Sequence, residues 1–186
     1  MARPPRVNIA GGIYHVVARG NAKQPIYLDD GDRRSFLGIL RDALDAFEWR
    51  CLTYCLMPNH YHLVTLTLDR NLSEGMKRLN GLYAQRFNRR HDRCGHLFQG
   101  RFGATLIESD AHMLEVVRYV ALNPVRAGLV ARPEEWEWNG HREILGLSAR
   151  HLVSLRDVLA PFGGSGDQLS LYRDFLATAS GTPPEH

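Results

Sequence analysis

Two histidines separated by a single residue are the first candidates for chemistry in this sequence. His60 and His62 lie in the segment MPNHYHLV. Alternate side chains of a β-strand share one face, so the two imidazoles would point the same way and Tyr61 the opposite way. Such a pair can ligate a divalent cation once a third ligand joins it. Half-buried histidines without a ligand role are the commoner outcome for such a pair taken alone.

A tyrosine and an amide follow at helical spacing further along the chain. The apolar periodicity predicts a helix from about Ala111 to Leu122 that stops at Asn123, because the residue before a proline disfavours the α region. Tyr119 and Asn123 are then neighbours at positions i and i+4, opposite the apolar stripe. A phenol has a solution pKa of about 10, so it needs an adjacent cation or base to act as a nucleophile. For a lone tyrosine, a hydroxyl in water at a helix edge is the commoner role.

The histidine pair and the tyrosine together suggest one reaction. A metal held by His60 and His62 would polarise a phosphodiester while Tyr119 attacks it in line. A 5′-phosphotyrosine would form and a 3′-hydroxyl would leave, which conserves the bond energy for a later joining step. The chain contains no GxxxxGK[ST] motif, so no nucleotide-binding loop is expected.

Positive charge is concentrated in one segment of a nearly balanced chain. The formal net charge of the whole chain is +3. Between Met76 and Phe102, seven basic side chains stand against one acid, Asp92, so the segment carries +6 and the remainder −3. Such a concentration suits a polyphosphate partner, whereas the plain alternative is a solvated helix face. The seven basic residues are Lys77, Arg78, Arg86, Arg89, Arg90, Arg93 and Arg101.

Length and composition predict one globular unit with a short tail. A chain of 186 residues, 44% of them hydrophobic, is long enough for one buried core. We expect a catalytic domain over residues 1–145 and a tail over 146–186, partly helical, whose last residues, SGTPPEH, are disordered. No apolar run approaches the roughly 18 residues that cross a membrane, and residues 1–10 lack the apolar stretch of a secretory signal. A cytoplasmic, nucleoid-associated protein is therefore expected.

The cysteines predict neither a disulfide framework nor a structural zinc site. There are three, Cys51, Cys55 and Cys94, an odd number without CxxC spacing. We expect all three to be reduced, with Cys51 and Cys55 packed in the interior.

The order of the predicted elements defines a fold class. Strands are expected at 11–20, 50–57, 61–68 and 104–108, and helices at 29–47 and 73–90. The residues MPNH connect the second and third strands as a hairpin, and Ser73 is the expected N-cap of the second helix. This βαββαβ order is that of a ferredoxin-like α+β fold, an antiparallel sheet with helices on one face and the other face free for a site. The tail should contain a short helix from Gln168 to Ala177.

Four segments in this order and spacing resemble one known family. They read GGIYHVVARGN, MPNHYHLV, GHLFQGRF and YVALNPVRAGLV, and they look like the REP-associated tyrosine transposases and their insertion-sequence relatives of the HUH superfamily. The resemblance covers about residues 9–145. It implies that His60, His62 and Asn123 bind the metal, Mg²⁺ or Mn²⁺, and that Tyr119 is the nucleophile. Two imidazoles and an amide suit softer ions at least as well as Mg²⁺.

The resemblance also implies a substrate, a single-stranded DNA hairpin of the REP type with a short guide sequence at its foot. The basic helix and loop would then contact phosphates, while Phe98, Phe102 or Tyr83 would stack on unpaired bases. Two other functions remain open: a domesticated hairpin-DNA binder without chemistry, and a metallophosphodiesterase in which bound water attacks. The sequence leaves the oligomeric state open between a monomer and a homodimer that exchanges the tyrosine helix.

Overall fold

The described chain folds around one four-stranded antiparallel sheet. The computed structural model describes residues 9–163 and 166–178. The strands lie in the order β2-β3-β1-β4, and the predicted βαββαβ succession and α+β class are confirmed. The elements of this unit are β1 (Gly12–Arg19), α1 (Asp30–Ala46), β2 (Trp49–Met57), β3 (His60–Thr67), α2 (Leu72–Arg90) and β4 (Gly103–Ile107).

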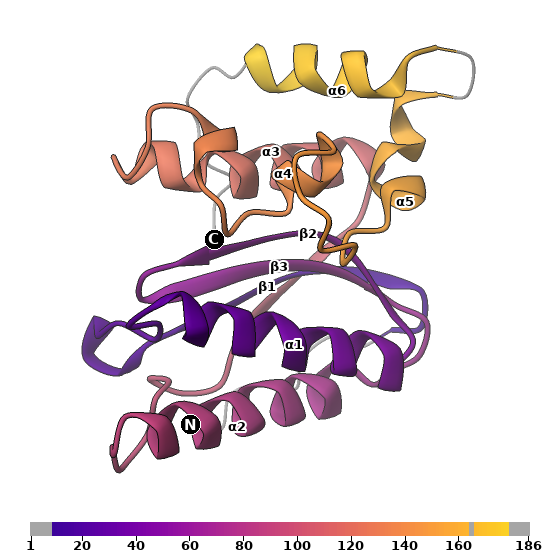
Figure 1. The fold of residues 1–186 in the computed structure, drawn as a ribbon. Coiled ribbons are helices and arrows are strands. Elements are labelled where there is room, and N and C mark those ends of the chain that lie inside the picture. The colour runs from indigo at the N-terminus through magenta and orange to yellow at the C-terminus, as the bar shows by residue number, and fades with distance from the viewer. Residues whose placement is uncertain (1–8, 164–165, 179–186) are drawn as a thin grey trace.

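Helices α1 and α2 pack side by side on one face of the sheet (Figure 1). Aromatic rings fill the interface, with Phe36 from α1 in contact with Tyr61 from β3 and Tyr83 from α2. The prediction that Ser73 caps α2 is wrong, because the N-cap residue is Asn71. The Asn71 side chain is held instead by Trp49, whose Nε1 donates to Asn71 Oδ1 over 2.6 Å.

Helix α3 (Asp110–Arg126) crosses the second face of the sheet, so this face is not left open as expected (Figure 1). Ser109 begins the helix by accepting a hydrogen bond from His112 N. The predicted end at Asn123 is also wrong, since the helix continues through Pro124. The proline lacks an N–H, but Ala127 N donates to Asn123 O over 3.0 Å and Leu129 N to Pro124 O over 3.0 Å, so the turn is completed.

The segment after α3 covers the outer edge of β2. Leu56 N donates to Trp138 O, Gly140 N to Tyr54 O, and Ser154 N to Cys51 O, at 2.8–2.9 Å. An uncovered edge strand exposes unpaired N–H and C=O groups that invite aggregation, so this segment completes the sheet. It includes the short helices α4 (His141–Ile144) and α5 (Leu155–Leu159).

The tail ends the described chain with α6 (Gln168–Ala177), as predicted. It lies over α3, where the Arg118 guanidinium is 4.4 Å from the centre of the Phe175 ring. The residues SGTPPEH, expected to be disordered, lie outside the described residues. Cys51 and Cys55 are free and buried, as expected. No helix in the described ranges combines the length and apolarity needed to cross a membrane.

Candidate active site

The two strand histidines lie at the start of β3, on the face that α3 covers. Their ring centroids are 5.0 Å apart. The turn before β3 is formed by Pro58 and Asn59, and His60 Nδ1 lies 2.7 Å from Asn59 Oδ1. If Nδ1 donates this bond, the Nε2 atom of His60 carries the lone pair and can serve as a ligand.

Helix α3 brings the predicted tyrosine and amide to the histidines. The Tyr119 ring stands edge-on to His62, with centroids 5.5 Å apart and planes at 89°. One turn further along, Asn123 Nδ2 lies 3.3 Å from His62 Nε2. Four residues selected from two distant segments of the sequence therefore meet at one place.

A third histidine, which the sequence analysis missed, is part of the same cluster. His15 Nε2 lies 2.9 Å from His62 Nδ1, and the two rings are within 19° of parallel, with centroids 5.1 Å apart. His15 is 4% exposed and His62 3%. Strand alternation in GGIYHVVARG places His15 on one face with Val17, the residue paired with His62. The sequence showed this alternation, but it could not show the register in which β1 pairs with β3.

Two arginines flank this cluster. Arg126 lies on α3 with its guanidinium carbon 5.3 Å from the centre of the Tyr119 ring, a cation–π distance. Arg19 is exposed at the end of β1 and is paired in register with His60. Arg126 was not predicted as a site residue, because the helix was expected to stop before it.

Burial and charge keep the first strand histidine neutral. Burial, together with the positive charge of Arg19, lowers the pKa of His60 from its ordinary value of 6.5 to about 4. A neutral imidazole retains a lone pair for a metal at neutral pH.

The donor set of the cluster fits a divalent cation with open positions. Two imidazole nitrogens and one amide group are available from His60, His62 and Asn123. Rotation of the amide would bring its oxygen to the place of Nδ2, beside His62 Nε2. Among the described residues, no group of three or more His, Cys, Asp or Glu side chains could hold a metal ion.

Three residues expected to bind DNA line one groove of about 780 Å³ between α2 and the loop before β4. They are Lys77, Phe98 and Arg101. Phe98 is half-buried, with its ring edge-on to Tyr61. The expectation that Tyr83 or Phe102 stacks on bases is not supported, since their exposed fractions are only 1% and 7%.

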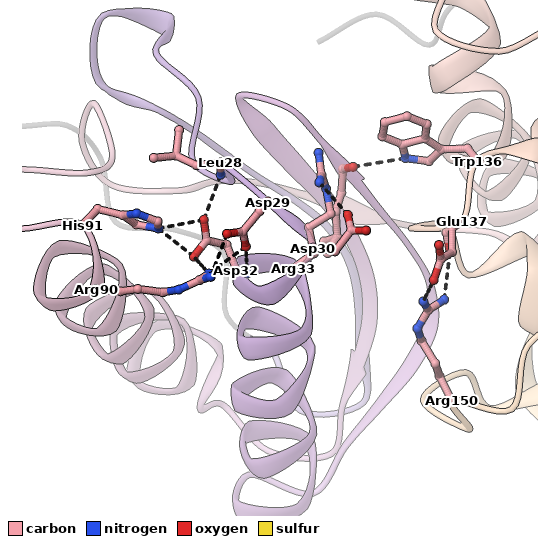
Figure 2. Close-up of polar contacts among 11 residues, drawn as sticks. Leu28, Asp29, Asp30, Asp32, Arg33, Arg90, His91, Trp136, Glu137 and Arg150 are labelled. Carbon is pink, nitrogen blue, oxygen red and sulfur yellow. Dashed lines mark hydrogen bonds and ion pairs between the residues drawn. The ribbon is translucent and has the colours of Figure 1, made fainter.

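Arg90, another expected DNA contact, is held by acidic side chains at the start of α1. Its guanidinium contacts both Asp29 and Asp32 (Figure 2), at 2.7 Å and 2.6 Å respectively. Asp32 is 2% exposed and also accepts hydrogen bonds from Leu28 N and His91. Burial by itself would raise the pKa of Asp32, but the hydrogen bonds from His91, Leu28 N and Arg90 outweigh it and lower that pKa. Arg90 thus joins α2 to α1.

The remaining basic residues lie on or near α2, on the face of the sheet opposite α3 (Figure 1). Arg93 covers the Phe87 ring at 5.6 Å. A DNA strand that contacts both the basic helix and Tyr119 must therefore pass around the sheet. The remaining exposed members on α2 are Arg78, Arg86 and Arg89.

Comparison with known proteins identifies the family. The sequence profile described as Transposase IS200 like matches residues 8–123, which include both strand histidines, Tyr119 and Asn123. The chain belongs to this family. This IS200-like transposase is 24% identical over 147 residues to a Haemophilus influenzae protein named as a REP-associated tyrosine transposase, covering 72% of this chain and 82% of the relative.

A solved structure, that of a REP-associated tyrosine transposase bound to a REP hairpin, has the same fold. It superposes with a TM-score of 0.65 at 18% sequence identity, over 83% of this IS200-like transposase and 92% of that chain. The predicted resemblance to REP-associated transposases and the predicted fold class are confirmed. As a member of a transposase family, the protein belongs with DNA-processing enzymes.

Proposed function

We propose that this transposase cuts and rejoins single-stranded DNA that carries REP-like hairpins, with Tyr119 as the nucleophile. The observation that carries the proposal is the position of the Tyr119 ring, 5.5 Å from the His62 ring and on the same helix face as Asn123. The hairpin substrate is supported by the solved relative, which is bound to a REP hairpin.

His60, His62 and Asn123 would hold the metal, Mg²⁺ or Mn²⁺. When bound, the ion would polarise the scissile phosphate as a Lewis acid. The remaining chemistry belongs to the chain. Tyr119 Oη forms a bond to phosphorus and loses its proton, while the bond from phosphorus to the 3′-oxygen breaks and that oxygen gains a proton. Attack of a 3′-hydroxyl on the phosphotyrosine reverses these changes and joins the strands.

Arg126 would neutralise a non-bridging oxygen of the scissile phosphate. Its guanidinium already lies 5.3 Å from the ring of the nucleophile. A positive group fixed beside the reacting phosphorus stabilises the charge that develops in the transition state. Arg19, exposed at the end of β1, would bind the next phosphate of the same strand.

The unpaired DNA next to the hairpin would follow the groove between α2 and the loop. The loop and the site meet at the end of β1, where Asn21 N donates to Leu97 O over 2.8 Å and Gln99 N to Arg19 O over 3.0 Å. Lys77 and Arg101 would contact phosphates there, and Phe98 would stack on a base. The groove thus offers a path from the basic helix to the histidine cluster.

The proposal is tested with Tyr119→Phe and a hairpin oligonucleotide labelled at either end, in the presence of Mn²⁺. We expect the wild-type protein to retain the label on the 5′-phosphate side of the cut as a covalent adduct on a denaturing gel. The variant should form no adduct yet still bind the hairpin. Tyr172→Phe is the matched control, because Tyr172 lies in α6 and its hydroxyl is bonded to His141, not to the histidine cluster.

Three other outcomes would contradict the proposal, each in a different way. Adducts that persist in Tyr119→Phe would refute the nucleophile. Cleavage without any protein-bound label would indicate attack by water, the phosphodiesterase alternative. Oligonucleotide that stays intact with wild-type protein and Mn²⁺ would indicate a hairpin-binding protein without chemistry.

A further inference from the structure

We propose that His15 is a positioning residue, whose Nε2 accepts the Nδ1–H of His62 and so keeps the Nε2 lone pair of His62 directed at the metal. The inference rests on the proposed function, since it concerns the same metal site. No part of that proposal requires a third histidine.

The contact between the two histidines is short and shielded from water. His15 Nε2 and His62 Nδ1 are 2.9 Å apart, and both side chains are at least 96% buried. The rings are within 19° of parallel. The two residues come from the neighbouring strands β1 and β3, whose hydrogen-bond ladder fixes their separation. A buried polar pair of this kind holds each ring in one orientation, because a lost hydrogen bond would not be replaced by water.

The partner at the other ring nitrogen sets the direction of the bond. Asn123 presents its Nδ2 group, a donor, to His62 Nε2 at 3.3 Å. With Nδ2 in that place, the lone pair of neutral His62 lies on Nε2 and its ring proton on Nδ1; when the amide turns its oxygen toward a metal, a metal at Nε2 requires the same tautomer. His62 Nδ1 then donates to His15 Nε2.

Metal-binding histidines usually donate their second N–H to a carboxylate, a backbone carbonyl or water, and loss of that partner weakens metal binding about 10-fold to 100-fold. Here the acceptor is a neutral imidazole. It orients His62 without adding a negative charge next to the scissile phosphate. The Tyr119 ring lies at 89° to the His62 ring, with centroids 5.5 Å apart.

The test compares three variants of the full-length protein. His15→Leu keeps an apolar side chain in the buried position but removes the acceptor. His15→Gln supplies an amide oxygen near the place of Nε2. Thr105→Ala is the matched control, because Thr105 is paired with His15 across β1 and β4, on the same face, and is exposed.

Two measurements separate positioning from folding. The first is Mn²⁺ affinity by calorimetry without DNA: we expect a loss of roughly 10-fold to 100-fold in His15→Leu and recovery to within about 5-fold of wild type in His15→Gln. The second is the ¹⁵N shifts of the His62 ring in metal-free protein. They should report the Nδ1–H tautomer in wild type, Thr105→Ala and His15→Gln, and a mixture in His15→Leu.

A His15→Leu protein that melts cooperatively, binds Mn²⁺ as wild type does and keeps the Nδ1–H tautomer would overturn the inference. Equal losses in His15→Leu and His15→Gln would also do so, because they would show dependence on packing alone. His60→Ala separates this failure from failure of the proposed function. If His60→Ala binds Mn²⁺ as tightly as wild type, the metal site itself is wrong and the role of His15 falls with it.

Discussion

The salt dependence of DNA binding should distinguish two arginines that the sequence presents as equivalent. Arg90 and Arg101 both belong to the basic segment, and replacing either by alanine removes one positive charge. Arg101 lines the groove between α2 and the loop. Arg90 is held by Asp29 and Asp32, so its charge is already neutralised within the protein (Figure 2). Only Arg101 is therefore expected to displace counterions from DNA.

The size of the effect follows from counting the cations in the groove. Each phosphate neutralised on a single strand contributes about 0.7 to the slope of log K against log salt. Lys77 and Arg101 are the lysine and arginine that line the groove. Arg101→Ala should therefore lower the slope by about 0.7 and the double variant with Lys77→Ala by about 1.4. Arg90→Ala should leave the slope within about 0.2 of wild type.

Fluorescence anisotropy with a hairpin carrying a labelled single-stranded flank, titrated between about 50 and 200 mM salt without divalent ions, measures these slopes. Arg90→Ala serves as the charge-matched control, and its fold is checked by a cooperative melt. If Arg90→Ala lowers the slope as much as Arg101→Ala does, the basic segment acts through net charge alone, and the assigned roles of the groove and the α1–α2 ion pairs are refuted.

Three further predictions concern the ion-pair network, the β2 edge and the site. The pKa of Asp32 is lower in the folded state than the value of about 4 expected in the unfolded state, so the ionised carboxylate stabilises the fold above that pH. This stabilisation is lost as the pH falls through the folded-state pKa. The urea midpoint of the wild type should therefore drop below about pH 4, and that of Asp32→Asn should drop less. Asn139→Ala removes the buried bond from Asn139 Nδ2 to Ala121 O, 2.9 Å long, and should lower the free energy of unfolding by about 1–3 kcal/mol in urea titrations; an unchanged midpoint would contradict this role. Arg126→Ala should slow single-turnover adduct formation roughly 100-fold, with partial recovery in Arg126→Lys, whereas equal rates would exclude the phosphate contact.

The candidate site was largely predictable because its residues follow local periodicities. A period of two places His60 and His62 on one strand face, and a period of 3.6 places Tyr119 beside Asn123. These relations hold within single elements, so they need no knowledge of the fold. Local periodicity failed at Pro124, where the helix was expected to stop. Helix α3 instead continues through Pro124, and its last turn places Arg126 next to the Tyr119 ring.

The sequence by itself determined the succession of elements, the polar face of each and the family to which the chain belongs. Only the tertiary structure decided which faces meet. The register of β1 against β3 joins His15 to His62, and the packing of α1 on α2 places Arg90 beside two carboxylates. Periodicity fixes the direction in which a side chain points from its own backbone. It does not specify the partner, because strand register and helix packing depend on long-range contacts whose energies are summed over the whole core.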